Sequence, residues 1–318
     1  MKILLFGSTG WIGHMVHEYL INKNHQVVNS KLRISGLEKF YNELLEELNN
    51  ENPDIVFNCA GITGSPNVDW CESHINETFD CNVLGMITMM NTCRKLKIPL
   101  VHFSSGCIYC NELQDLPPLE NVYKYTEKDV PNFTGSVYSL TRYLIEFFVL
   151  EDYKNHNSEI SILDNTLILR IRMPIVDVKH PKNLITKILN YPKLIEQYNS
   201  ISFLPELLPI GIEMGLNGKR GIYNFTNPGA ITHPWIVSQY NKIKNVKDSY
   251  KIISIEEQNN FLKSKRSTCI LDTTKLEDTL KELNQERMFR GEQLLILSDA
   301  KTAIIKSLEK IILNENKY

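Results

Sequence analysis

Short apolar runs alternate along the first half of the chain with segments in which apolar residues recur at helical spacing. The apolar runs predict strands at 2–6, about 25–29, 55–61, 99–105 and 165–174. The helical spacing predicts helices at 11–20, about 37–48, about 75–96 and 138–149. Each connection between parallel strands must cross one face of the sheet, so this alternation predicts an α/β fold, a Rossmann-type doubly wound parallel sheet.

The pattern changes near residue 170. Beyond this point the periodicity becomes irregular, and five prolines fall between residues 174 and 209. We therefore expect a dinucleotide-binding domain over 1–169 and a smaller, mixed, mainly substrate-binding region over 170–318. A segment near 220–228 is expected to return to the core sheet.

Composition narrows the class of protein. The net charge is -2 and no basic stripe is present, so nucleic acid is not an expected partner. No leader-like segment and no apolar run of membrane-spanning length is found, which predicts a cytoplasmic protein without a membrane partner. The seven cysteines are odd in number and irregularly spaced, which is typical of free thiols rather than a disulfide framework.

A glycine-rich turn follows the first strand. Gly7, Gly10 and Gly13 form GxxGxxG, and the turn and first helical residues also include Ser8, Thr9, Trp11 and Ile12. A diphosphate must approach the backbone N–H groups of such a helix N-terminus closely, and side chains there would block it. This turn predicts dinucleotide binding, the alternative being merely a tight turn.

The end of the second strand bears on the choice of cofactor. An acidic residue there would hold the ribose hydroxyls of NAD, whereas this chain has Asn29, Ser30 and Lys31, followed by Arg33. NADPH is therefore expected and NADH is less favoured, although a cation after a strand is often only solvated. The end of the third strand, Cys59, Ala60 and Gly61, is also placed on the cofactor.

Three further residues form a catalytic pattern. Ser105 ends the fourth strand, and Tyr138 is followed four residues later by Arg142 on one helix face. Together with the glycine turn, this resembles the Ser, Tyr, Lys constellation of the extended short-chain dehydrogenase/reductases. The chain departs from that family at Arg142, where the family has lysine; arginine keeps the charge, but proton relay through an ammonium group is lost. Taken alone, the tyrosine and arginine could be packing and surface residues.

Several longer motifs narrow the resemblance. The chain is similar to the epimerase/reductases that complete UDP-L-rhamnose synthesis and to the related dTDP-4-dehydrorhamnose reductases. The motifs are GITGSPNVDWCESH (61–74), VPNFTGSVYS (130–139), LRIRMP (169–174), NLITKI (183–188), ELLPIGIEM (206–214), NFTNPG (224–229) and RSTCILDTTKL (266–276).

The resemblance implies a substrate, UDP-4-keto-6-deoxy-D-glucose, that is inverted at C3 and C5 before its C4 ketone is reduced. Inversion needs an acid and a base, and a thiol on the loop after Ser105 can take one of these roles, which we assign to Cys107. The resemblance singles out Lys187 as the second group. Cys107 and Cys110 also form a CxxC, so a redox dithiol, half a metal site or a structural role are alternatives; no metal is expected.

Other residues are expected to contact the substrate from loops at the carboxyl edge of the sheet or from the second region. Arg170 and Arg172 lie on the same side of a strand, and Arg172 is the one that we place on the substrate, although bracing a loop is an alternative. Trp70 is assigned equally to packing or contact. The remaining expected contacts are Thr63, Asn67, Gly106, Asn132, Phe133 and Asn183, with Ser105, Cys107 and Lys187 also counted.

The sequence therefore predicts an NADPH-dependent 4-keto sugar reductase that also has 3,5-epimerase activity and makes UDP-L-rhamnose. One alternative is a reductase that acts only on an already epimerised dTDP- or UDP-linked sugar. Another is a non-catalytic nucleotide-binding regulatory subunit. The resemblance is also compatible with a homodimer paired through helices of the core domain.

Overall fold

The computed structural model describes residues 1–111, 113, 116–155 and 160–315. The chain forms two compact units, and neither is a single continuous stretch. Unit 1 comprises Met1–Ile108, Pro131–Arg170 and Gly211–Tyr223, and unit 2 comprises Tyr109–Val130, Ile171–Ile210 and Asn224–Tyr318. Besides the exchange of chain near residue 170, the chain leaves unit 1 over 109–130 and returns to it over 211–223, next to the segment near 220–228 that we expected to return to the core sheet.

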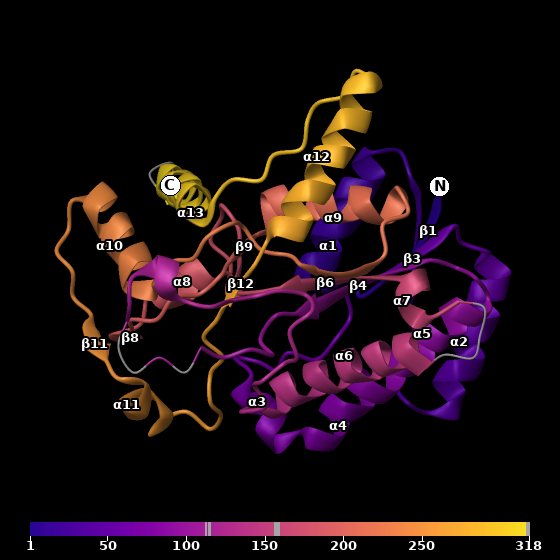
Figure 1. Cartoon of the computed structure of the whole chain (residues 1–318), viewed down its shortest axis with the longest axis horizontal. Helices are drawn as coiled ribbons and strands as arrows, with labels where there is room; N and C mark the ends of the chain where they lie inside the picture. Colours follow the sequence, from indigo (N-terminus) through magenta and orange to yellow (C-terminus); the bar gives the residue numbers. More distant parts are fainter. Residues whose placement is uncertain (112, 114–115, 156–159, 316–318) are drawn as a thin grey trace. The chain divides into compact units, whose positions relative to one another are not determined.

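A six-stranded sheet with the order β10-β6-β4-β3-β1-β2 forms the centre of unit 1 (Figure 1). Strand β1 pairs in parallel with β2 and β3, and β3 pairs in parallel with β4, as a doubly wound fold requires. The strands are β1 (Lys2–Phe6), β2 (Gln26–Asn29), β3 (Ile55–Asn58), β4 (Leu100–Ser105), β6 (Thr166–Ile171) and β10 (Gly221–Asn224). The predicted Rossmann-type α/β fold is confirmed.

Helices cover both faces of this sheet. The helices of unit 1 are α1 (Trp11–Asn22), α2 (Glu38–Glu51), α3 (Asp69–Ser73), α4 (Ile75–Phe79), α5 (Met86–Lys95), α6 (Val137–Asn155), α7 (Ile162–Asn165) and the second half of α9 (Leu204–Leu216). On one face, α2, α5 and α6 bury Leu44, Met89 and Ile145 against strand residues such as Val56. Helix α1 lies on the opposite side of the sheet (Figure 1). This two-faced burial explains why the central strands are apolar without alternation.

The helix predicted over about 75–96 contains an unexpected turn. Its middle, Asp80–Gly85, is a π-helix between α4 and α5. Such a turn inserts an extra residue and rotates the side chains that follow, and it occurs frequently at functional sites. The buried amide of Asn82 lies in this turn.

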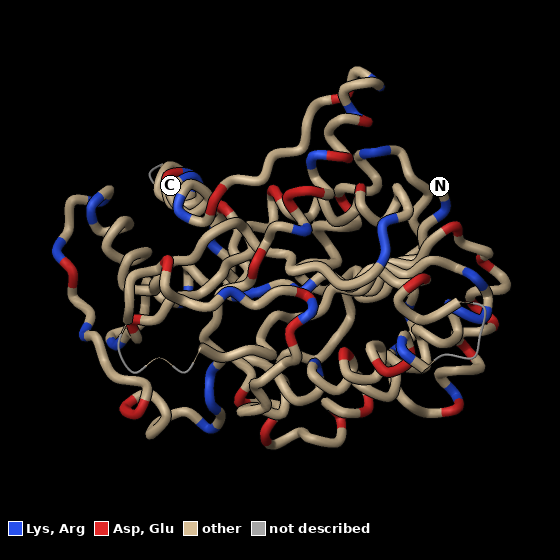
Figure 2. Tube along the Cα trace, viewed as in Figure 1, with Lys and Arg blue, Asp and Glu red and all other residues tan. Residues whose placement is uncertain are grey.

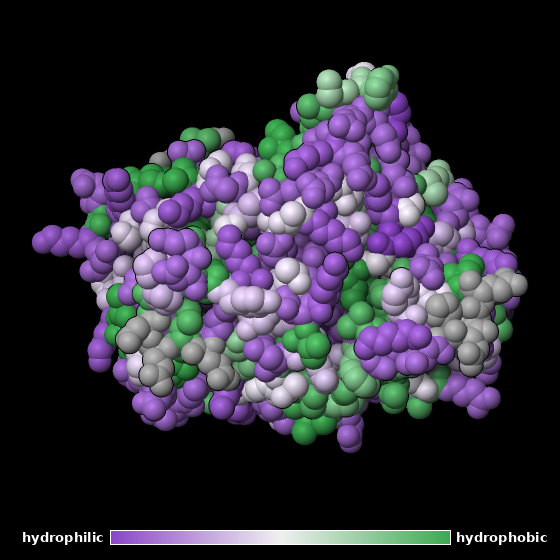
Figure 3. Space-filling view, viewed as in Figure 1, coloured by the Kyte–Doolittle hydropathy of each residue, from purple (hydrophilic) through white to green (hydrophobic). Residues whose placement is uncertain are grey.

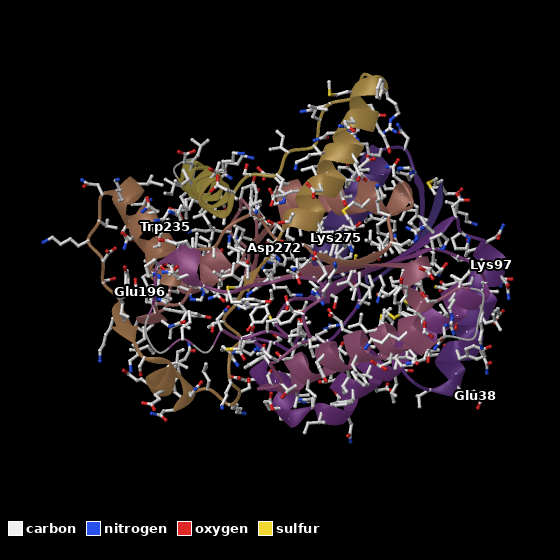
Figure 4. The ribbon with its side chains drawn as sticks, viewed as in Figure 1. Glu38, Lys97, Glu196, Trp235, Asp272 and Lys275 are labelled. Atoms are coloured by element: carbon white, nitrogen blue, oxygen red, sulfur yellow. The ribbon has the colours of Figure 1, made fainter. Side chains whose placement is uncertain are left out.

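Unit 2 contains short strands and several helices. They are β5 (Lys124–Tyr125), β7 (Pro174–Ile175), α8 (Leu184–Ile188), β8 (Lys193–Ile195), β9 (Ser202–Phe203), α10 (His233–Lys244), β11 (Lys251–Ile253), α11 (Ile255–Asn259), β12 (Ile270–Leu271), α12 (Thr274–Phe289) and α13 (Ala300–Glu315), with one 3-10 turn, Leu119–Asn121. Its core includes Ile185, Ile236 and Ile304 from three different helices. Just before α12, the Asp272 carboxylate accepts a hydrogen bond from the N–H of Thr274. Asp272 and Lys275, at the start of this helix, are labelled in Figure 4.

The surface gives no sign of a large single-charge field. Along the parts of the chain that the structure describes, basic and acidic residues are interspersed in each unit (Figure 2). Exposed apolar residues gather at the end of α12, where Phe289 is 92% and Met288 66% exposed, and pale green atoms mark this tip in Figure 3. Among the described helices, none is both long and apolar enough to cross a membrane.

Candidate active site

Two glycines of the turn lie too close to neighbouring backbone to carry a side chain. Gly7 has φ +76°, and a Cβ there would lie 2.7 Å from the backbone nitrogen of Ala60. A Cβ on Gly13 would lie only 2.0 Å from the carbonyl oxygen of Gly7, so the helix could not pack this closely on the turn. Gly10, the residue at the N-terminus of α1, offers no side chain to cap the helix. The turn with Ser8, Thr9, Trp11 and Ile12 therefore fits the cradle expected for a dinucleotide.

A carboxylate lies near the predicted ribose site after β2. The Ser30 hydroxyl donates to Glu47 Oε2 at 2.7 Å and accepts from the N–H of Leu32 at 3.2 Å. Burial raises the pKa of Glu47, partly opposed by the hydrogen bond from Ser30. Glu47 lies on α2, so the sequence around β2 does not reveal that a carboxylate lies close to Ser30. Asn29 and Lys31 are exposed on either side of Ser30.

The loop after β3, where Cys59, Ala60 and Gly61 were placed on the cofactor, is fixed by two buried amides. Asn58 Oδ1 accepts from the N–H of Ala60 at 2.9 Å. Asn82 both accepts from the N–H of Ile62 and donates to its carbonyl, each at 2.8 Å. Sequence analysis missed Asn82, because helical periodicity does not reveal a π-helical turn that directs an amide inward.

The helix with Tyr138 and Arg142 begins at a well-defined N-terminus. The Ser136 hydroxyl accepts from the N–H of Ser139 at 3.0 Å. The Glu72 carboxylate accepts from the N–H of Val137 at 2.8 Å. Glu72 was also missed, although it lies within the 61–74 motif. Both contacts fix the turn that positions the half-buried Tyr138.

Arg142 is a buried cation directly beneath the tyrosine ring. It is 4% exposed, and its guanidinium carbon lies 5.1 Å from the centroid of the Tyr138 ring. Its Nη2 lies 3.4 Å from Asn82 Oδ1, and its Nε has no hydrogen-bond partner among the described residues. Gly61 makes room for it, since a Cβ there would lie 2.8 Å from Nη2. An unpartnered buried donor of this kind fits a cofactor hydroxyl group.

The loop after β4 brings further predicted residues together. The Ser105 hydroxyl accepts from the N–H of Cys107 at 3.1 Å, and Cys107 is a half-buried cysteine that forms no disulfide within the described chain. The Ile108 carbonyl accepts from the N–H groups of Asn132 and Phe133 at 3.1 and 3.0 Å. Ser105, Gly106, Cys107, Asn132 and Phe133 thus belong to one connected loop pair in unit 1.

His102 lies three residues before Ser105 and is fully buried. Burial, together with the charge of Arg142, lowers its pKa to about 3. The imidazole is therefore neutral at physiological pH. Its Nδ1 lies 3.2 Å from Asn58 Nδ2.

The CxxC is not a closed unit. Neither of its cysteines forms a disulfide within the described chain, and the sulfur of Cys110 lies 3.6 Å from the hydroxyl of Thr268 in unit 2. Within the described ranges, no group of three or more His, Cys, Asp and Glu residues is arranged to hold a metal ion.

The 61–74 loop has its own internal contacts. Asn67 Oδ1 accepts from the N–H of Asp69 at 2.8 Å, and Thr63 is exposed. Trp70 stacks on His74 with centroids 3.6 Å apart, which favours the packing role for Trp70. Substrate contacts from Thr63 and Asn67 remain predictions.

The arginines of LRIRMP both form internal contacts. Arg170 forms a buried ion pair with Glu146 in unit 1. Arg172 is buried in unit 2, where it donates to Asn199 Oδ1 and, at 2.9 and 2.7 Å, to the hydroxyl and carbonyl of Ser267. These bonds correspond to the bracing alternative; a substrate contact from Arg172 remains only a prediction.

Asn183 and Lys187 lie at the two ends of one helical turn in unit 2. Asn183 caps α8, with its Oδ1 accepting from the N–H of Ile185 at 3.2 Å and its Nδ2 donating to the Val176 and Val178 carbonyls. This fully buried amide is engaged with protein, so its diphosphate contact remains a prediction. Lys187 is half-buried, and burial, with the charge of Lys182, lowers the pKa of its ammonium group.

Comparison with known proteins gives the family. The family model of the RmlD substrate binding domain matches residues 1–191. The chain belongs to this family. Its relatives include the bifunctional dTDP-4-dehydrorhamnose 3,5-epimerase/dTDP-4-dehydrorhamnose reductase of Arabidopsis thaliana, which is 38% identical over 89% of this chain and 88% of the relative.

Two further proteins are similar to this chain. The trifunctional UDP-glucose 4,6-dehydratase/UDP-4-keto-6-deoxy-D-glucose 3,5-epimerase/UDP-4-keto-L-rhamnose-reductase of Arabidopsis thaliana is 38% identical over 89% of the chain, which spans 40% of that protein's length. The crystal structure of the UDP-rhamnose synthase of Acanthamoeba polyphaga mimivirus is 30% identical, with a TM-score of 0.83 over 98% of this chain and 99% of that one.

Proposed function

We propose that this RmlD-family chain is an NADPH-dependent 4-reductase and 3,5-epimerase that converts UDP-4-keto-6-deoxy-D-glucose to UDP-L-rhamnose. The observation that carries the proposal is the pairing of Tyr138 with the buried cation of Arg142, which lies against Gly61, in a chain whose relatives carry both activities in their names.

Reduction needs a proton donor at the C4 oxygen of the sugar. A reduced nicotinamide held at the glycine turn would supply the hydride for C4. The Tyr138 hydroxyl gives its proton to the oxygen, so that the ketone becomes an alcohol, and the cation of Arg142 at 5.1 Å stabilises the resulting phenolate. The Ser105 hydroxyl accepts from the N–H of Cys107 with a lone pair, so its own proton stays available to donate to the carbonyl oxygen.

The same two hydroxyls serve epimerisation. Loss of a proton from C3 or C5 gives an enolate whose charge rests on the C4 oxygen, where hydrogen bonds from Ser105 and Tyr138 stabilise it. In this proposal Cys107 and Lys187 remove the proton from one face and return one to the other. The lowered pKa of Lys187 supports such a role, because an ammonium closer to neutrality exchanges protons more readily.

The proposal is tested by incubating the purified chain with UDP-4-keto-6-deoxy-D-glucose and NADPH and identifying the product by NMR. UDP-L-rhamnose is expected from the wild type and not from Tyr138→Phe. A parallel incubation uses an already epimerised 4-keto-rhamnose as the substrate. If the chain reduces only this second sugar, it is a 4-reductase alone. Binding of NADPH without turnover of either sugar would identify a non-catalytic subunit.

A further inference from the structure

Helix α6 places three functional groups in line. Tyr138, Arg142 and Glu146 follow one another at four-residue intervals and so share one face of the helix. Arg142 is 4% exposed and Glu146 is 0% exposed. A buried cation thus has a buried carboxylate one turn away.

The expected ion pair between these two residues does not form. Side chains on a helix lean toward its N-terminus, so an unrestrained Glu146 would cover the turn of Arg142. Instead, Arg170 from β6 holds the carboxylate, with Nε 2.9 and 3.1 Å from Oε1 and Oε2 and Nη2 2.5 Å from Oε2. In the described part of the chain, no carboxylate lies within ion-pair distance of Arg142.

Three described titratable groups that interact directly with the charge of Arg142 are themselves neutral. His102 from β4 has a pKa of about 3 and is neutral at physiological pH. Burial raises the pKa of Cys71 from α3 and of Cys81 from the π-helix, so both thiols keep their protons. The described charged groups that also act on these thiols are Glu72, Asp80 and Arg33. The Glu72 carboxylate is hydrogen-bonded to the N–H of Val137 at the start of α6, and Asp80 Oδ1 accepts from the N–H of Gly36.

We infer that Arg170 is a positioning residue for the reductase site: it holds Glu146 away from Arg142 and so keeps the charge of Arg142 available to Tyr138. The Glu146–Arg170 pair is neutral as a unit, so Arg142 provides the net charge on this face of α6. A carboxylate moved onto Arg142 would cancel that charge and disfavour the phenolate. This inference rests on the proposed function for its catalytic meaning but not for its test.

The test is a titration of Tyr138 that needs no substrate. The tyrosinate absorbance of each protein is recorded against pH, and that of the same protein carrying Tyr138→Phe is subtracted. For Arg170→Met, we expect the midpoint of this difference to rise by about one pH unit or more, because Glu146 is released toward Arg142. In Glu146→Gln/Arg170→Met, the midpoint is expected to return to the wild-type value, since the glutamine amide carries no charge. An unchanged midpoint in Arg170→Met, or a midpoint that stays raised in the double variant, would overturn the inference.

A second variant covers the case in which Arg170→Met does not fold. Glu146→Gln keeps a hydrogen-bond acceptor for Arg170 but removes one negative charge. The midpoint of the Tyr138 titration is therefore expected to fall. A midpoint equal to that of the wild type would again contradict the positioning role. Reduction of the 4-keto sugar by the wild type is measured separately, so failure of the proposed function and failure of this inference give different results.

Discussion

The guanidinium carbon of Arg142 lies 5.1 Å from the centroid of the Tyr138 ring, one turn further along the same helix. The extended short-chain dehydrogenase/reductases, which this chain resembles, have lysine at this position. Arginine must therefore supply the same charge with a larger, planar and permanently protonated group. The buried position of Arg142 indicates that the substitution is accommodated inside the site.

Removal of this charge should impair reduction. We expect Arg142→Met to lower kcat/KM for reduction of the keto sugar by about 100-fold or more, the lower range of an acid–base contribution, because the Tyr138 phenolate loses its counter-charge. Arg142→Lys is the matched control and should retain most activity. Steady-state loss of NADPH absorbance measures both, and equal rates for the methionine variant and the wild type would contradict the electrostatic role.

Gly61 and Arg142 should be energetically coupled. A methyl group on Gly61 would lie 2.8 Å from Arg142 Nη2, whereas lysine has no atom equivalent to the second guanidinium nitrogen. Gly61→Ala is expected to lower kcat/KM about tenfold with Arg142 and only slightly with Arg142→Lys, a coupling of about 1 kcal/mol. A double-mutant cycle measures this, and equal losses in both backgrounds would exclude the steric explanation.

Glu72 should position the start of the tyrosine helix. Glu72→Ala leaves the N–H of Val137 without its acceptor and is expected to destabilise unit 1 by about 1 kcal/mol, as for other lost helix caps. The effect on reduction should appear in kcat more than in KM, because the residue adjacent to Val137 is Tyr138. Glu72→Gln retains an acceptor and is the control; an equally large loss in this variant would show that the charge, not the hydrogen bond, matters.

His102 should make the protein sensitive to acid. Its pKa is lowered to about 3, so between about pH 6.5 and that value the unfolded chain binds a proton that the folded chain does not. The free energy of unfolding therefore falls as the pH falls, by about 2 kcal/mol at pH 5 for this residue. Urea unfolding at pH 7 and pH 5 should show a smaller loss for His102→Gln than for the wild type, and the same loss in both would rule out this origin.

Lys31 should contribute to the choice of cofactor. Lys31 is exposed after β2 and follows Ser30, whose hydroxyl already donates a hydrogen bond to Glu47. Lys31→Ala is expected to weaken NADPH binding by about fivefold, the value of roughly 1 kcal/mol for one solvated charge pair, and to leave NADH binding nearly unchanged. Fluorescence titration with both cofactors tests this, with Lys95→Ala, on α5, as a remote charge control.

The strands and helices of unit 1 could be predicted because their apolar periodicity is a local property. The association of 109–130 with unit 2 could not, since it depends on β5 pairing with β12, far away in the sequence. The glycine turn, Ser105 and Tyr138 were recognisable from spacing. Asn82, Glu72 and Glu47 were not, because each acts on a segment distant in sequence through a single side chain. Asn183 and Arg172 were placed on the substrate, whereas the structure shows only their contacts with protein.

In the proposed function, the hydroxyls of Ser105 and Tyr138 hold the C4 oxygen both for epimerisation and for reduction, and solvent exchange tests this most directly. The wild type, Cys107→Ser and Lys187→Met are incubated with UDP-4-keto-6-deoxy-D-glucose in deuterated water without NADPH, and the sugar is followed by NMR. We expect deuterium at C3 and C5 with the wild type and strongly reduced labelling in both variants. No labelling at either carbon with the wild type, while NADPH is still oxidised by an already epimerised sugar, would contradict the account and leave a reductase alone.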